Sequence, residues 1–131
     1  YKRIRIAYIE AARKRPEEFE KDNVAEKMEQ AKIIMNENVC KEIDPEELAE
    51  KLNISYSWFR KTFKKYTGYS PAKYFQELKL RKAKQILINT SYPVKEICFM
   101  IGYTSTEHFS NLFKKNTGLT PLEYRSFGKD E

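Results

Sequence analysis

The chain has 131 residues, 40% of them hydrophobic and 34% charged, which is enough apolar material for one domain or two small ones. No apolar run approaches the roughly 18 residues that a membrane-spanning helix needs, so we exclude such a segment and expect no membrane partner. The net charge is +6, and residues 44–131 carry most of the excess, which indicates a polyanionic partner.

The N-terminal residues are expected to belong to a longer protein. The sequence starts at Tyr1 without an initiator Met and shows no apolar signal segment, so we expect a fragment. Residues 1–15 are predicted to form a helix that ends before Pro16, and residues 16–22 to form a charged connector. We therefore assign residues 1–22 to a linker, or to the tail of a missing upstream domain.

Neither the cysteines nor any other cluster predicts a metal or cofactor site. Cys40 and Cys98 stand beside apolar residues at a spacing that fits no metal motif. We predict two buried, reduced thiols in a cytoplasmic protein. The sequence contains no nucleophile–base pair and no phosphate loop, so we predict no enzyme, no metal and no cofactor.

The next helices follow from hydrophobic spacing and from capping residues. A short helix is predicted after Asp44, an acidic N-cap that precedes Pro45 at the first helical position. It ends at Asn53, a residue that tolerates the left-handed turn conformation. Ser55 then caps a helix that Gly68 stops. Upstream of these, a helix over residues 22–38 is predicted from apolar residues at steps of three and four: Val24, Met28, Ala31, Met35 and Val39.

A long basic helix is predicted at the centre of the chain. Ser70 caps it, Pro71 occupies its first position, and it runs to Asn89. Because an α-helix rises 1.5 Å per residue, it spans roughly 28 Å. Shorter helices are predicted over about residues 94–101, 106–116 and 121–126. No strand is predicted, so the expected fold is all-α.

An internal repeat organises these helices. The repeat has two parts. In the upstream part, at an offset of forty-nine residues, Leu48, Leu52 and Asn53 correspond to Ile97, Ile101 and Gly102. The longer match, between residues 59–76 and 109–126, has an offset of fifty. It pairs Phe59, Phe63, Lys64, Lys65, Thr67, Gly68, Pro71 and Tyr74 with Phe109, Phe113, Lys114, Lys115, Thr117, Gly118, Pro121 and Tyr124.

Each copy has the pattern of a helix-turn-helix motif, in which the second helix enters the major groove of DNA. Successive major-groove segments on one side of B-DNA lie about 34 Å apart, close to the length of the linking helix. A monomer with two copies is therefore predicted to grip two consecutive turns of a duplex, with some bending of the DNA. A helical protein-interaction adaptor and an RNA-binding module remain as alternatives.

The two copies resemble a known family. The run from Gly102 to Lys115, followed by Gly118-Leu119-Thr120-Pro121, is similar to the C-terminal signature of the AraC/XylS family of bacterial transcription regulators. The first copy, from Leu48 through Gly68-Tyr69-Ser70-Pro71, is similar to the first motif of that family. The resemblance covers about residues 24–127.

The resemblance implies an architecture and a set of partners. We expect two homeodomain-like helix-turn-helix subdomains joined by a long linking helix, with an extra N-terminal helix. The DNA-binding domain is assigned to residues 23–127, with motifs at about 45–67 and 94–117, the linking helix at 71–89 and a tail at 128–131. The expected partners are a double-stranded DNA operator, RNA polymerase, and an effector ligand bound by a missing N-terminal domain.

Candidate DNA contacts follow from helix position. Arg60 is the foremost candidate, because its planar fork matches guanine O6 and N7, whereas Asn111 suits adenine and Glu107 suits cytosine. The predicted base contacts are Tyr56, Ser57, Arg60, Lys61, Thr106, Glu107, Ser110 and Asn111. The predicted phosphate contacts, made by lysines and by two helix N-termini, are Lys64, Lys65, Pro71, Lys79, Lys114, Lys115 and Pro121.

Two positions depart from the family pattern, and the aromatic residues are assigned to the core. The family commonly has Arg where this chain has Lys79, and often Arg where it has Asn111, which changes the contacts expected there. The four-residue spacing of the repeated phenylalanines places them inside, opposite the basic face. Trp58 and Phe99 are likewise expected to pack in the core.

Overall fold

The computed structural model describes the backbone of residues 16–129 and the side chains of residues 23–128, and in this part of the chain helices joined by short loops form all of the regular structure, without a strand. The prediction of an all-α fold is therefore confirmed. The helices, in chain order, are α2 (Pro16–Glu37), α3 (Pro45–Lys51), α4 (Tyr56–Thr67), α5 (Pro71–Asn89), α6 (Val94–Met100), α7 (Thr106–Thr117) and α8 (Pro121–Lys129).

Local sequence explains where most helices begin and end. The Asp44 carboxylate accepts a hydrogen bond from the Glu46 backbone at 3.0 Å, and Ser55 caps α4 through the Trp58 backbone at 3.2 Å. In the turns of the two motifs, Asn53 (φ 59°) and Gly102 (φ 88°) adopt the left-handed conformation. The predicted caps and stops are thus confirmed.

The two ends of the described chain differ from prediction. The connector expected over residues 16–22 is wrong, because α2 begins at Pro16, which fits the first position of a helix as well as it fits a helix stop. At the other end, α8 runs to Lys129, so the helix enters the stretch assigned to a tail at 128–131. The helix predicted over residues 1–15 lies outside the described residues.

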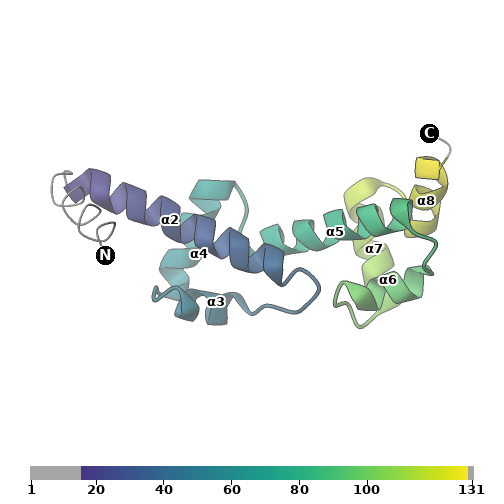
Figure 1. The fold of residues 1–131 in the computed structure, drawn as a ribbon, viewed down its shortest axis with the longest axis horizontal. Coiled ribbons are helices and arrows are strands. Elements are labelled where there is room, and N and C mark those ends of the chain that lie inside the picture. The colour runs from purple at the N-terminus through teal and green to yellow at the C-terminus, as the bar shows by residue number, and fades with distance from the viewer. Residues whose placement is uncertain (1–15, 130–131) are drawn as a thin grey trace, which may run out of the picture.

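The helices form two clusters on one rod. In Figure 1, α5 runs along the middle of the molecule, with α2, α3 and α4 around one of its ends and α6, α7 and α8 around the other. The helix pairs that pack most extensively either lie within one cluster or include α5. We call α2–α4 with the start of α5 the first unit, and the remainder of α5 with α6–α8 the second unit.

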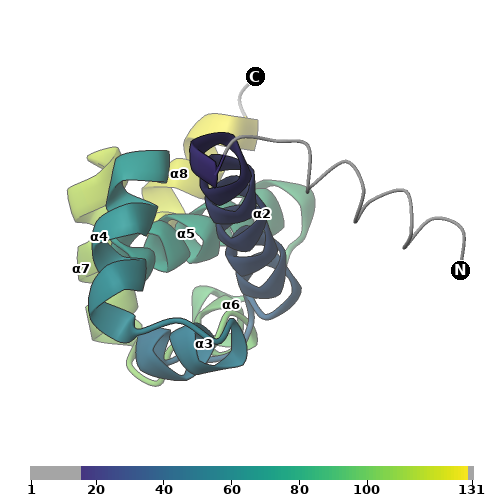
Figure 2. The same ribbon diagram turned by 90° about the vertical axis from the view of Figure 1, so that its left-hand side faces the viewer.

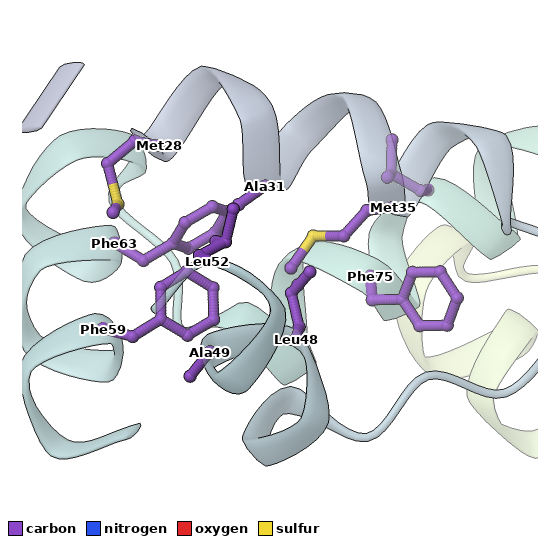
Figure 3. Close-up of a cluster of buried hydrophobic side chains, with 10 residues drawn as sticks. Met28, Ala31, Met35, Leu48, Ala49, Leu52, Phe59, Phe63 and Phe75 are labelled. Atoms are coloured by element: carbon purple, nitrogen blue, oxygen red, sulfur yellow. The ribbon is translucent and has the colours of Figure 1, made fainter. Parts of the chain in front are cut away.

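Each unit has its own apolar core. Met28, Met35, Leu48 and Phe63 are almost fully buried in the first core, which Figure 3 shows between α2, α3 and α4. The second core is built in the same way, from Leu80, Ala83, Leu87, Ile97, Cys98, Ile101, Phe109 and Phe113. Burial of these aromatic and aliphatic side chains is the main source of stability in both units.

The repeat extends further upstream than the sequence comparison had shown. At an offset of fifty-two residues, Lys27, Met28, Ala31, Ile34 and Met35 of α2 match Lys79, Leu80, Ala83, Ile86 and Leu87 of α5. Both helices also end alike, because the Asn38 amide donates to the Ile34 carbonyl and the Thr90 hydroxyl donates to the Ile86 carbonyl. Each unit is therefore one complete copy of a three-helix bundle, and α5 belongs to both.

Three side chains predicted to be buried are exposed instead. Cys40 follows the end of α2 at Glu37, and its thiol faces solvent from the loop, whereas Cys98 is buried as expected. Trp58 is 39% exposed and Phe99 is 52% exposed. Trp58 directly precedes the inward Phe59, and Phe99 directly follows the inward Cys98. One residue along a helix is a rotation of 100°, which carries each of these two side chains off the buried face.

Candidate nucleic-acid interface

The packing of α4 determines which of its side chains reach solvent. Phe59 and Phe63 are fully buried, with ring centroids 5.4 Å apart. The opposite faces of the helix are exposed, and α4 contains no acidic residue. The exposed residues include six of the predicted DNA contacts: Tyr56, Ser57, Arg60, Lys61, Lys64 and Lys65.

The start of α5 lies beside this basic face. A surface hollow of about 380 Å³ is lined by Arg60, Lys61 and Lys64 of α4 and by Ser70 and Pro71 of α5, among others. The first turn of α5 carries no acidic residue, so its backbone N–H groups add partial positive charge to that of the side chains. The Pro71 ring itself is buried, so the Pro71 side chain offers an anion no contact, and the backbone N–H groups of the first turn are the candidates for one.

On α7 the exposed face is less basic. Glu107 and Asn111 are exposed, whereas Ser110 and Thr106 are half-buried. Burial raises the pKa of the Cys98 thiol, and the neighbouring Thr106 side chain partly offsets this. The remaining predicted contacts on this helix, Lys114 and Lys115, are exposed in its last turn.

The N-terminus of α8 differs from that of α5. The Glu123 carboxylate accepts a hydrogen bond from the Thr120 backbone at 3.4 Å, while the Thr120 hydroxyl accepts one from the Glu123 backbone at 3.2 Å. This is a capping box, and it places a negative charge where a phosphate would bind. The Pro121 ring is buried as well. A phosphate contact at this end therefore faces a competing carboxylate that α5 lacks.

The two recognition helices lie on the same side of the molecule. Viewed along the long axis in Figure 2, α4 and α7 overlap to one side of α5, and α2 lies on the other side. Each helix is tied near its C-terminal end to a glutamate on the first helix of its unit. The Tyr66 hydroxyl donates to Glu29 at 2.6 Å, and the Asn116 amide donates to Glu77 at 3.0 Å.

The Glu29 contact also changes the acidity of both partners. The hydrogen bond from Tyr66 lowers the pKa of the Glu29 carboxyl and raises that of the tyrosine hydroxyl. Both groups are exposed, so the contact serves to orient α4 on α2 and adds little to stability.

Lys79 does not belong to this surface. The prediction that it contacts phosphate is wrong, because its side chain is only 5% exposed and its ammonium donates to three backbone carbonyls. The acceptors are Val39 at 2.9 Å, Lys41 at 2.7 Å and Ile101 at 2.6 Å. The sequence suggested a phosphate contact because Lys79 has basic neighbours on a long helix. In the structure, Lys79 lies on the buried face of α5 instead.

Sequence reasoning overlooked Trp58 as a member of the exposed face of α4. In the sequence, Trp58 stands between Ser57 and the inward Phe59. In the structure, it lines a surface hollow together with Asn23 and Val24 of α2. The available signal was its position one residue before a buried phenylalanine, because a rotation of 100° about the helix axis turns the side chain away from the core.

Within residues 16–129, no helix is long and apolar enough to cross a membrane. Among the side chains of residues 23–128, no group of three or more histidine, cysteine, aspartate or glutamate residues is placed to hold a metal ion.

Known proteins are similar to this chain in both sequence and fold. A family profile described as a helix-turn-helix domain matches residues 48–126. The HTH-type transcriptional regulator GbdR of Pseudomonas aeruginosa is 33% identical over 99 residues, which cover 76% of this chain and 27% of GbdR. The lactose operon transcription activator of Staphylococcus xylosus is 36% identical over 104 residues, or 79% of this chain and 37% of the activator.

A solved structure agrees with these matches. A transcriptional regulator from Chromobacterium violaceum, described as containing an AraC-type DNA-binding domain, superimposes with a TM-score of 0.75 at 30% identity, covering 79% of this chain and 93% of that one. The chain spans about a quarter to a third of the length of the curated relatives GbdR and the lactose operon activator. The repeat, the paired recognition helices and these matches together show that the chain belongs to the AraC/XylS family of DNA-binding transcription regulators.

Proposed function

We propose that this domain binds an operator in double-stranded DNA by inserting α4 and α7 into successive segments of the major groove. The observation that carries the proposal is the placement of both helices on one side of α5. The 19 residues of α5 span roughly 28 Å, and adjacent groove segments lie about 34 Å apart. The difference favours DNA that bends toward the protein, at a cost on the order of 1–6 kcal/mol.

In this proposal α4 supplies most of the affinity. Arg60 reads guanine with its two-pronged guanidinium, and Lys61 reads a neighbouring guanine or contacts its phosphate. Tyr56 and Ser57 face base edges from the first turn of α4, where recognition helices make their base contacts. The phosphates flanking this groove are bound by Lys64 and Lys65 and by the backbone N–H groups at the start of α5.

We propose that α7 contributes mainly to selectivity among base sequences. Asn111 pairs with adenine, and Glu107 accepts a hydrogen bond from the amino group of cytosine while repelling phosphate. The half-buried Ser110 and Thr106 approach base edges at closer range. The predicted phosphate contacts on this helix are Lys114 and Lys115, to which the N-terminus of α8 at Pro121 adds backbone N–H groups.

The wider activity extends beyond this domain. We propose that the intact protein is a cytoplasmic regulator whose upstream domain binds an effector ligand and whose DNA-bound form contacts RNA polymerase. We further propose that this domain acts by binding alone and catalyses no reaction. These proposals are supported by family membership and by the length of the relatives, which extend well beyond the matched region.

Selection of bound sites from a random duplex library tests the proposal directly. We expect two short boxes about one helical turn apart, with guanine in the box read by α4. Mobility-shift titrations of a selected site should resist competition by RNA. Four lysine–phosphate contacts predict that log K falls with log salt at a slope of about −4. Enrichment of a single box, equal competition by RNA, or an affinity that is independent of salt would each contradict the proposal.

A further inference from the structure

Lys79 lies where the two units meet. Two of its three acceptors, the carbonyls of Val39 and Lys41, belong to the loop between α2 and α3 in the first unit. The third, the carbonyl of Ile101, ends α6 in the second unit. The ammonium also lies 4.8 Å from the centre of the Phe75 ring and 5.6 Å from that of Tyr103. One buried cation therefore bonds to backbone from both units.

The matching lysine of the first unit makes only part of this arrangement. Lys27 corresponds to Lys79 in the repeat, and its ammonium donates to the Leu52 carbonyl at 2.8 Å. Leu52 ends α3 just as Ile101 ends α6, so each lysine satisfies a carbonyl that the helix end leaves without a partner. Lys27 is half-buried and, among the side chains and backbone of residues 23–128, its ammonium has this single acceptor, which belongs to its own unit. Lys79 differs from Lys27 in having two additional acceptors, the carbonyls of Val39 and Lys41.

The backbone around Lys79 is closely packed. A Cβ atom placed on Gly102 would lie 2.8 Å from the Lys79 ammonium and 3.0 Å from the Cys40 carbonyl oxygen. The turn of the second motif therefore touches the loop of the first unit directly, and a side chain at residue 102 would push the two apart. Gly102 also has φ 88°, so this position favours glycine for its backbone as well as for its space.

We propose that Lys79 is a positioning residue that fixes the first unit against the second, so that α4 and α7 face one duplex at the same time. Its three acceptors are strong backbone groups, and a neutral apolar replacement would leave them unpaired in a buried site. Without this joint, the units are connected mainly through α5, and long helices bend. The consequence for DNA binding rests on the proposed two-groove function, whereas the joint itself does not.

Distance measurements in free protein test the joint without DNA. Spin labels at Lys65→Cys and Lys115→Cys, which are exposed and equivalent positions of α4 and α7, report the spacing of the two helices. Cys40→Ser removes the exposed thiol, and Cys98 is buried away from the label. We expect one narrow distance distribution that Lys79→Met broadens and Lys79→Arg preserves.

Lys27→Met provides the matched control for this measurement. It removes the equivalent helix-end hydrogen bond but touches only the first unit, so the distribution should stay narrow. An unchanged distribution in Lys79→Met, or equal broadening in Lys27→Met, would overturn the proposal. If Lys79→Met does not fold, Gly102→Ala perturbs the same contact from the other side and should broaden the distribution by itself.

Binding measurements then connect the joint to DNA. On a selected two-box duplex, Lys79→Met should bind about tenfold more weakly than the original protein, because the second helix no longer acts at a high effective concentration. On the same duplex with the second box scrambled, both proteins should bind equally well. Equal losses on the two duplexes would overturn the proposal. If the original protein itself ignores the scrambling, the two-groove function fails, and the spin-label result still decides whether Lys79 holds the units together.

Discussion

The inner faces of α4 and α7 make nearly the same contacts in the two units. The ring centroids of Phe59 and Phe63 are 5.4 Å apart, and those of the matching pair on α7 are 5.8 Å apart. Each helix packs a tyrosine edge against its second phenylalanine, Tyr74 at 5.2 Å and Tyr124 at 5.3 Å. The threonine that ends each helix donates to the carbonyl four residues back at 2.8 Å.

The outer faces of the same helices differ. The exposed side of α4 has four basic residues and no acid, whereas α7 has only two lysines and carries an acidic residue, Glu107, in its first turn. The preceding helices differ too, since the exposed Phe99 and Met100 of α6 stand where α3 has Glu50 and Lys51. Packing has kept the buried positions alike, while the exposed positions have been free to take separate tasks.

The largest expected effects test whether the two cores are energetically equivalent. Phe63→Ala and Phe113→Ala each remove a fully buried ring, and each should lower the free energy of unfolding by about 3–5 kcal/mol. Urea denaturation followed by circular dichroism measures both. Because α5 runs through both cores, we expect one transition in each variant. A loss below about 1 kcal/mol in only one of them would show that the units are not equivalent inside.

The next effects test the difference between the outer faces. Arg60→Ala should weaken binding to a selected duplex by about 1–3 kcal/mol, roughly five- to 150-fold, and should relax the preference for guanine at one position. Asn111→Ala should weaken binding by less than tenfold and change the preference only in the second box. Fluorescence anisotropy on duplexes with single base changes measures both effects.

A charge-conserving variant sharpens this test. Arg60→Lys keeps the positive charge but removes the planar fork, so it should retain the salt dependence of binding and lose the base preference. If Arg60→Lys reads bases as well as the original protein, Arg60 acts as a phosphate contact instead. If Asn111→Ala weakens binding more than Arg60→Ala does, the assignment of affinity to α4 and selectivity to α7 is reversed.

Most of the fold could be predicted because its signals are local. Ser55, Ser70 and Ser105 accept hydrogen bonds from backbone N–H groups as N-caps, and Gly68 and Gly118 stop the recognition helices with φ near 85°. Such features depend on a few neighbouring residues, so a single sequence reveals them. The α2–α5 part of the repeat was missed because only five positions match there and the exposed ones have diverged.

The error at Lys79 concerns a residue whose surroundings come from distant parts of the chain. Lys79 is buried by a loop that lies about forty residues upstream and by a turn more than twenty residues downstream. Leu78 and Leu80 flank Lys79, whereas Arg81 precedes the exposed Lys82 on the same helix, but apolar neighbours alone do not reveal three backbone acceptors for the ammonium. Cys40 was judged by its apolar neighbours, but α2 ends at Glu37, and in the loop beyond it the thiol faces outward. Tertiary contacts decide the case of Lys79, whereas the end of α2 decides that of Cys40.

The smallest expected effect is a pH dependence at the contact between the two units. Burial lowers the pKa of the Lys79 ammonium below its ordinary 10.5, and the nearby Cys40 and Glu42 offset part of that change. Between the lowered value and 10.5, the unfolded chain holds this proton more tightly than the folded chain does. The contribution of Lys79 to the free energy of unfolding must therefore rise with pH across that window.

Lys79→Arg isolates this contribution, because a guanidinium stays protonated throughout the window. Urea titrations at a series of alkaline pH values should show the original protein gaining stability relative to the variant as pH rises. Tyr103 faces the ammonium, and burial raises the pKa of its hydroxyl, so both proteins share its ionisation and it cancels in the difference. Both should carry Cys40→Ser, which removes the nearby thiol from the comparison. Parallel curves for the two proteins would mean that Lys79 is not desolvated, and the joint between the units would then be open to water.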